Sequence, residues 1–192
     1  LTSNPAQGDV PYGTLTTMSE SPFRFGLIYV GTDDGMIHLS KDGGYTFTLL
    51  SAKLPKGLYV SRVLASAYSE SRVYATLNGY RNDHFNAYVY VSDDYGTTWK
   101  QIMKDLPLEA VNVITEDNLS SQVLYVGTDG GLYVSTDGGT SSMGWSKGLP
   151  NAVPIHDIVI HPRDNEIILG THGRSLYTSK LDDLHKKVQV KK

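Results

Sequence analysis

The strongest constraint on the fold is an internal repeat. Four segments of the chain align with one another: "LIYVGTDDGMIHLSKDGGYTF" (27–47), "RVYATLNGYRNDHFNAYVYVSDDYGTTW" (72–99), "VLYVGTDGGLYVSTDGGTSSMGW" (123–145) and "EIILGTHGRSLYTSKLDD" (166–183). Each contains a threonine after its first apolar run, and spacings of 44, 52 and 43 residues separate Thr32, Thr76, Thr128 and Thr171. A repeat of this length indicates units that each pack on their neighbours.

Each unit is predicted to form four short strands, called A to D. Strand A comes from the apolar runs "GTLTTM", "SRVLASA", "VNVITE" and "HDIVIHP". The runs are rich in Val, Ile, Tyr and Thr and are separated by Gly, Asp, Asn and Pro, as is typical of strands and turns. Units of this size match the blades of a β-propeller. We therefore expect an all-β chain of four four-stranded antiparallel sheets, forming one segment of a larger propeller, with blades at approximately 13–50, 58–103, 109–147 and 154–183 and a tail at 184–192.

A polar motif recurs between strands C and D, as "SKDGGYTF" (40–47), "SDDYGTTW" (92–99) and "STDGGTSSMGW" (135–145). Its acidic and hydroxyl groups could bind a metal, take part in acid–base chemistry or organise a hairpin turn. The turn is favoured, because Asp94 can accept hydrogen bonds from backbone N–H groups and Gly96 can adopt a positive φ. Trp99 would then return toward the core, as Phe47 would in the first unit. The residues assigned to these turns are Ser40, Asp42, Gly44, Phe47, Ser92, Asp94, Gly96, Trp99, Ser135, Asp137 and Gly139.

The first two motifs resemble the Asp-box, or BNR, repeat S-x-D-x-G-x-T-[WF] of sialidase-like, sortilin-like and xyloglucanase-like propellers. The third motif departs from it by three residues inserted before Trp145, and the fourth unit lacks it. The segment "IHDIVIHPRDNEIILGTHGRSLY" (155–177) is similar to the last blade of bacterial sortilin-like or glycosyl-hydrolase-like repeat proteins. The resemblance implies a structural turn remote from the ligand face, and a secreted, periplasmic or cell-surface location in a bacterium.

Candidate binding residues are expected on the B–C and D–A loops, which share one face of a propeller and converge over its channel. The longest B–C loop, "LNGYRNDHFNA" (77–87), combines aromatic and charged groups that can stack on a sugar or peptide and bind its polar edges. The alternative is that this insertion is simply tolerated at the surface. The candidate ligand-binding residues are Asp33, Asp34, Tyr80, Arg81, Asp83, His84, Asp129, His172 and Arg174.

Arg174 has two interpretations. It could contribute a basic contrast to the acidic B–C loops, or it could pair with Asp157 or Asp129 of a neighbouring blade as a clamp. His156 and His161 flank an apolar strand, where a histidine is more typically a hydrogen-bonded structural residue than a ligand.

Composition and missing motifs exclude several classes of function. With 17 basic and 20 acidic residues and a net charge of -3, the chain lacks the positive charge typical of nucleic-acid binding. No apolar run reaches the ~20 residues of a membrane span. The chain has no cysteine and no clustered histidine motif, so we expect no metal site and no cofactor. Phosphate-loop and serine-hydrolase motifs are also missing.

The expected function is a non-catalytic recognition or scaffold section of a secreted or surface Asp-box propeller, which binds a protein, peptide or glycan through its B–C and D–A loops. The alternative is part of a xyloglucanase-like glycoside hydrolase, which requires two carboxylates ~5 to 10 Å apart. Sialidase activity is disfavoured, because only Arg81 and Arg174 would supply arginines on the ligand face.

An open arc of four blades would expose the faces of its first and last sheets. The expected partner is therefore the remainder of a parent propeller or a second copy of this chain. The start at Leu1 also suggests a fragment. The last unit lacks a clear strand D, which could come from "LHKKVQVKK", where Val188 and Val190 alternate as in an edge strand, or from "LTSNPAQGDV" at the other end.

Overall fold

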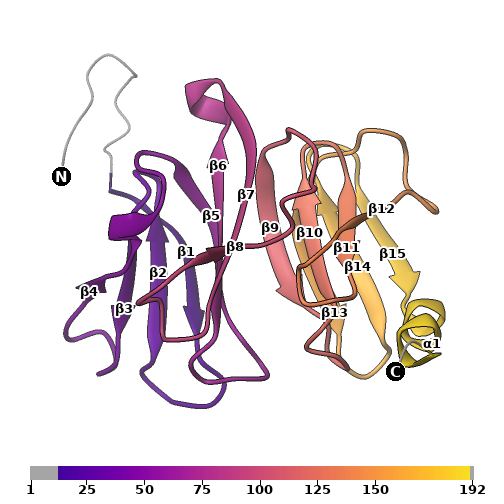
Figure 1. The fold of residues 1–192 in the computed structure, drawn as a ribbon. Coiled ribbons are helices and arrows are strands. Elements are labelled where there is room, and N and C mark those ends of the chain that lie inside the picture. The colour runs from indigo at the N-terminus through magenta and orange to yellow at the C-terminus, as the bar shows by residue number, and fades with distance from the viewer. Residues whose placement is uncertain (1–12, 191–192) are drawn as a thin grey trace.

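The computed structural model describes residues 13–190 and contains four antiparallel sheets (Figure 1). Sheet I contains β1 (Leu15–Glu20), β2 (Ile28–Thr32), β3 (Ile37–Ser40) and β4 (Thr48–Leu49). Sheet II contains β5 (Tyr59–Ala65), β6 (Val73–Gly79), β7 (His84–Ser92) and β8 (Lys100–Gln101). Sheet III contains β9 (Val111–Glu116), β10 (Leu124–Thr128), β11 (Leu132–Ser135) and β12 (Met143–Trp145). Sheet IV contains β13 (Ile155–His161), β14 (Glu166–Thr171) and β15 (Leu176–Lys180). Each sheet pairs its strands in chain order, so the predicted all-β architecture of repeated antiparallel sheets is confirmed.

Within residues 13–190, three short helical segments join or follow these sheets: η2 (Ser51–Lys53), η3 (Tyr80–Asn82) and α1 (Asp182–Val190). The hairpin of β6 and β7, which contains η3, projects at one end of the sheets, and α1 lies at the opposite end (Figure 1). Within residues 13–190, no helix is long and apolar enough to cross a membrane.

Successive sheets are joined along their first strands. On β1, the side-chain oxygens of Thr17 and Ser19 accept hydrogen bonds from the backbone N–H groups of Val63 (3.2 Å) and Ala65 (2.9 Å) on β5. The hydroxyl of Thr16 donates to the Val60 carbonyl at 2.7 Å. Threonine and serine thus supply polar contacts between strands that belong to different sheets.

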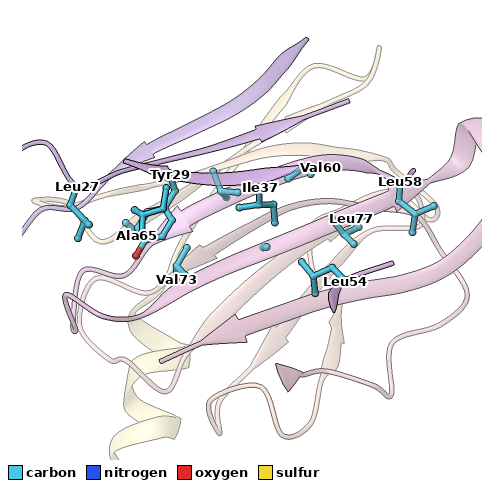
Figure 2. Close-up of a cluster of buried hydrophobic side chains, with 12 residues drawn as sticks. Leu27, Tyr29, Ile37, Leu54, Leu58, Val60, Ala65, Val73 and Leu77 are labelled. Atoms are coloured by element: carbon cyan, nitrogen blue, oxygen red, sulfur yellow. The ribbon is translucent and has the colours of Figure 1, made fainter. Parts of the chain in front are cut away.

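The core consists of apolar layers between neighbouring sheets. In the layer between sheets I and II, Tyr29 and Ile37 face Val60 and Leu77, and all four side chains are fully buried (Figure 2). Similar layers lie between sheets II and III and between sheets III and IV. At about 25 cal/mol per Å2 of apolar area buried, these layers are the main favourable contribution to folding.

A bulge near the start of each first strand sets the true alignment of the four units. The pairing skips one residue between Leu15 and Thr17, and it skips one residue at the same place in β5, β9 and β13. Beyond the bulge, the next paired residues on the second strands are Gly31, Thr76, Gly127 and Gly170. The predicted equivalence of Thr76 with Thr32 is therefore wrong by one residue, because Leu77 occupies the position of the threonine.

The polar turns between the third and fourth strands share one hydrogen-bond pattern. In the second turn, Asp94 Oδ1 accepts from Ser92 Oγ (2.7 Å) and Thr98 N (2.8 Å), and Asp94 Oδ2 accepts from Thr98 Oγ1 (2.7 Å). Ser92 is buried, and its Oγ accepts from the N–H of Gly96 at 2.8 Å, where the glycine has a φ of 84°. The first turn repeats these contacts around Asp42.

The third turn keeps the same pattern despite its inserted residues. Asp137 accepts from Ser135 Oγ (2.8 Å) and from Ser141 Oγ (2.6 Å), and Ser141 stands where the first two turns have a threonine. The insertion therefore lies after the hydrogen-bonded part of the turn. The three inserted residues place Trp145 later in the chain and leave the hydrogen bonds of the turn in place.

These hydrogen bonds favour the ionised aspartates. Donation from Thr46 to Asp42 and from Thr98 to Asp94 lowers the pKa of each carboxyl from its usual value to about 2. For Asp137, burial raises the pKa, but the hydrogen bonds from Ser141 and Ser135 outweigh it and lower the pKa overall.

The two aromatic residues that close the first two turns differ in their surroundings. Trp99 packs against the core layer between sheets I and II, and its Nε1 donates to the Leu50 carbonyl at 3.2 Å. Phe47 was expected to do the same but is 48% exposed. The reason is that Trp99 packs toward the preceding sheet, and among the described residues sheet I has no preceding sheet.

Sheet IV has three strands, and α1 follows where a fourth strand was considered. Leu181 is fully buried in the layer between sheets III and IV, and His185 Nε2 lies 2.7 Å from Oδ2 of the buried Asp117. Asp182 and Asp183 in the first turn favour the helix through its dipole. The predicted edge strand in "LHKKVQVKK" is therefore wrong, and "LTSNPAQGDV" lies outside the described residues.

We predict that Ser92→Ala lowers the free energy of unfolding by about 1–2 kcal/mol, because the N–H of Gly96 then loses its hydrogen-bond acceptor at a buried site. Urea unfolding followed by circular dichroism measures the change. Ser146→Ala removes an exposed hydroxyl and serves as the control. Equal stability of the two variants would contradict the prediction.

We also predict an acid dependence of stability that arises from the turn aspartates. Because the pKa values of Asp42 and Asp94 are lower in the folded state, their stabilisation is complete above the unfolded-state pKa of about 4 and is lost as the pH falls toward about 2. Urea midpoints measured across this range should fall less in Asp94→Ala than in the wild type. The same loss in both proteins would assign the acid dependence to other groups.

Candidate functional site

A pocket of about 580 Å3 lies at the end of the sheets where the B–C and D–A loops meet. This is the end from which η3 projects (Figure 1). Sheets II, III and IV and their connections all contribute side chains. The lining residues are Tyr59, Ser61, Asn78, Tyr80, Arg81, Asn112, Asp129, Pro154, His156 and His172.

The repeat itself builds the pocket. Ser61, Asn112 and His156 are the bulge residues of three successive first strands. Asn78, Asp129 and His172 follow the equivalent residues Leu77, Thr128 and Thr171 of the second strands, so they are equivalent as well. In each of the three sheets, the bulge residue and the residue that follows the second strand thus line the pocket. The residue types at these two positions differ from sheet to sheet.

Backbone contacts fix these loops. The N–H of Asp129 donates to the Ala110 carbonyl at 3.1 Å, and the N–H of His172 donates to the Pro154 carbonyl at 3.2 Å. Each contact ties a B–C loop to the D–A segment of its own sheet. The pocket is therefore supported by paired strands as well as by loops.

A chain of side-chain hydrogen bonds crosses the pocket from sheet II to sheet III. Asn78 Nδ2 donates to Asn112 Oδ1 at 2.8 Å, and Asn112 Nδ2 donates to Asp129 Oδ1 at 2.8 Å. Asn112 is buried, and both hydrogen bonds are partly buried at the wall of the pocket. The chain orients the carboxylate of Asp129, whose second oxygen accepts no hydrogen bond within the described part of the protein.

Aromatic and cationic groups lie beside this chain. The guanidinium of Arg81 lies 5.0 Å from the centre of the Tyr59 ring. Tyr80 is 61% exposed and contacts Phe85 edge to face, with ring centroids 6.1 Å apart. The rings of His156 and His172 lie 5.3 Å apart. The pocket therefore offers ring faces for stacking and hydrogen-bonding groups of both kinds.

Four of the nine candidate ligand-binding residues line the pocket: Tyr80, Arg81, Asp129 and His172. The other five do not. His84 Nε2 lies 2.7 Å from the hydroxyl of Tyr88, and the two rings stack. Asp83 ends η3 with a φ of 52°, in the left-handed region.

The two acidic candidates in the first unit have local roles. Asp33 Oδ1 accepts from the backbone N–H groups of Gly13 (2.7 Å) and Thr14 (2.9 Å), and Asp34 accepts from the hydroxyl of Thr32. Both carboxylates therefore organise their own loop. Neither lines the pocket.

The clamp considered for Arg174 is made by another arginine. Asp157 on β13 pairs with Arg62 on β5, and Asp129 is bound by Asn112. Among the described residues, Arg174 makes no ion pair or hydrogen bond. Arg62 of sheet II thus makes the ion pair with Asp157 that was one of the two interpretations of Arg174.

Six lining residues were not among the candidates: Tyr59, Ser61, Asn78, Asn112, Pro154 and His156. Asn78 was missed because the units were aligned one residue out of register, which concealed its equivalence with Asp129. Ser61 and Asn112 sit at bulges, which the apolar pattern does not reveal. His156 was interpreted as a structural histidine.

The charge of the pocket limits its chemistry. Asp129 is the single carboxylate among its lining residues in the described chain. Over residues 13–190, no group of three or more His, Asp or Glu side chains is placed to hold a metal ion. The groups present can bind and orient a polar molecule.

Comparison with sequence models of known families gave no match, and comparison with curated proteins gave none either. Solved structures are similar in fold. The GH74 xyloglucanase from Xanthomonas campestris superposes with a TM-score of 0.69 at 16% identity, covering 88% of this chain and 29% of that one. YCF48 bound to D1 peptide gives a TM-score of 0.63 at 16% identity, covering 87% and 52%. The extracellular domain of BT4673 from B. thetaiotaomicron gives 0.63 at 14% identity, covering 90% and 21%.

The fold is that of β-propeller blades. Identities of 14 to 17% show the fold alone. The chain spans between a quarter and a third of the GH74 structures that it matches, with 29% and 25% coverage of two of them.

We predict that the hydrogen-bonded chain through Asn112 is rigid. The side-chain amide protons of Asn112 should exchange with solvent at least about 10-fold more slowly than those of the exposed Asn151, because burial and a donated hydrogen bond both slow exchange. Nuclear magnetic resonance measures both rates. Asp129→Ala should accelerate the exchange at Asn112 and leave Asn151 unchanged, and equal rates in the wild type would show that the chain is open in solution.

Proposed function

We propose that the pocket is a ligand-recognition site and that the chain is a non-catalytic recognition section of a β-propeller protein. The observation that carries the proposal is the convergence of three sheets on one pocket whose wall combines exposed aromatic rings, amides and a single carboxylate. Such a wall binds by stacking and hydrogen bonding. Glycoside hydrolysis uses a pair of carboxyl groups, and Asp129 is the single carboxylate that lines the pocket among the described residues.

The proposed ligand is a glycan or a peptide. Tyr59 and Tyr80 supply apolar ring faces, while Asn78, Asn112 and Asp129 supply donors and acceptors for hydroxyl or amide groups. Two structural neighbours support these classes: a xyloglucanase by its name, and YCF48, which was solved with D1 peptide. Arg81 would contact an acceptor on the ligand.

A second candidate is that the chain is part of a xyloglucanase-like glycoside hydrolase, which is favoured by the similarity of its fold to the GH74 xyloglucanase. In that case Asp129 would be one of two carboxylates, and its partner would come from outside the described residues. Release of reducing ends from xyloglucan tests this alternative.

The recognition section is proposed to work as one sector of a larger ring, completed by the remainder of a parent propeller or by a second copy of this chain. An extracellular or surface location is part of the same proposal, supported by the likeness to an extracellular domain. The polar turns of Asp42, Asp94 and Asp137 are proposed to stabilise their sheets and to take no part in binding, because they lie at the opposite end from the pocket.

We predict that Tyr80→Ala combined with Arg81→Ala weakens binding at least about 10-fold, since both a stacking face and a cation are lost. An array of xyloglucan oligosaccharides, other glycans and peptides first identifies a binder. Calorimetry on that binder then compares the variant with the wild type.

The matched control is Arg24→Ala combined with Tyr45→Ala, which removes the same two residue types from the turns at the opposite end. Tyr45 is 91% exposed, so its loss leaves the core intact. Binding should be unchanged in this control. Equal weakening in both variants, or in neither, would place the binding site elsewhere.

A further inference from the structure

The two outer faces of the arc carry residues whose equivalents are buried inside it. Leu15 on β1 is 62% exposed, whereas Val60 and Ile155, which occupy the same register position on β5 and β13, are fully buried. Met18 is 70% exposed, whereas its equivalent Val63 is 1% exposed. The face of sheet I that contains β1's Leu15 and Met18, here called the first face, thus has the composition of an interior layer.

The outer face of sheet IV shows the same property. Leu176 on β15 is 67% exposed, whereas its equivalents Ile37 on β3 and Leu132 on β11 are 0% and 3% exposed. Val159 on β13 is 52% exposed on the same side. This surface, here called the fourth face, is the side that would meet a following sheet.

In sheets I and III a glycine lies where the following sheet packs, and Thr76 occupies this position in sheet II. A Cβ placed on Gly31 would lie 2.4 Å from Val60 of the next sheet, and one placed on Gly127 would lie 2.7 Å from Ile155 of the next sheet. The equivalent Gly170 on β14 has only Asp157 of its own sheet nearby, at 3.4 Å. Sheet IV therefore has an open position over Gly170 that could accept an aliphatic side chain, and no other sheet fills it among the described residues.

We propose that the first face of one copy of this chain packs on the fourth face of a second copy, with Leu15 seated over Gly170 of its neighbour. We choose a second copy as the occupant because this one sequence contains both halves of the contact. Gly170 has no side chain of a following sheet packed on it, and Leu15 holds the register position of Val60 and Ile155, which pack on such a glycine. The contact would repeat the glycine-centred packing seen between sheets I and II and between sheets III and IV. Within residues 13–190, sheet IV has three strands, and the proposed junction is argued from these three.

A polar contact supports the same orientation. Glu116 on β9 accepts from Ser66 Oγ and from the N–H of Ala67 in the preceding sheet, each at 2.7 Å. Glu20 is the equivalent of Glu116, and His161 is the equivalent of Ser66. Glu20 Oε1 already accepts from the N–H of Gly26 at 2.8 Å, and His161 Nδ1 accepts from the N–H of Asp164 at 3.2 Å. The proposed junction would therefore bring Glu20 Oε2 to Nε2 of His161, which can donate a hydrogen bond.

The test uses light scattering after size exclusion on the 192-residue chain of 21.1 kDa, with two blocked variants. Leu15→Lys with Met18→Lys blocks the first face, and Val159→Lys with Leu176→Lys blocks the fourth face. All four positions are exposed, so each variant should keep the wild-type circular dichroism spectrum and unfolding temperature. Leu15→Val is the conservative control.

We expect the wild type and Leu15→Val to have a mass at least twice that of one chain, and each blocked variant alone to be monomeric. A 1:1 mixture of the two blocked variants should restore a dimer, because each retains the face that the other has lost. A monomeric wild type at all concentrations would overturn the proposal. So would a dimer that survives in one blocked variant, since that contact would be symmetric, or a mixture that stays monomeric. The result is independent of ligand binding.

Discussion

The close approach of neighbouring sheets is the contact on which the rest of the structure depends. Gly31 and Gly127 let Val60 and Ile155 approach within distances that any side chain at the glycine would prevent. Where the sheets approach this closely, the apolar side chains between them are fully buried, and Thr16, Thr17 and Ser19 of sheet I reach the backbone of β5. A layer of this kind needs two sheets, so no unit is stable alone, and the pocket exists only because three sheets are held in a fixed relation.

The repeat period made the architecture predictable, because apolar runs and turn residues alternate too regularly for another fold class. The register inside each unit was not predictable from the same pattern. A bulge adds one residue without changing the apolar character of the strand, so the threonine at position 76 could be mistaken for the equivalent of Thr32. That error concealed Asn78 while leaving Tyr80, Arg81, Asp129 and His172 visible as polar residues in loops. The pattern of "SKLDDLHKK" (179–187) allows a helix as well as an edge strand, because the contact that anchors α1 joins His185 to Asp117, 68 residues away.

The two ends of the sheets differ in whether their side-chain hydrogen bonds stay within one turn or join different sheets. At one end, each turn aspartate is bound by groups within four residues, so the turn is stabilised locally and its chemistry is the same in three sheets. At the other end, the side chains reach across sheets, as Asn78 and Asn112 do, and the residue types differ from one sheet to the next. Uniform local bonding holds the hairpins, and the residues at the opposite end can therefore differ from sheet to sheet without loss of the turns.

The bulge position shows how one site in the repeat can serve either purpose. It holds Thr16, Ser61, Asn112 and His156 in the four sheets. The short hydroxyl side chains of Thr16 and Ser61 donate to the carbonyls of Val60 and Val111 in the next sheet, each at 2.7 Å, and so act as clamps. The longer amide of Asn112 instead reaches the B–C loops, where it joins Asn78 to Asp129. The imidazole of His156 extends farther still and meets His172. Side-chain length at a position that strand pairing leaves unpaired therefore decides how far the residue reaches: Ser61 binds the next sheet and also lines the pocket, whereas Asn112 and His156 extend to the B–C loops.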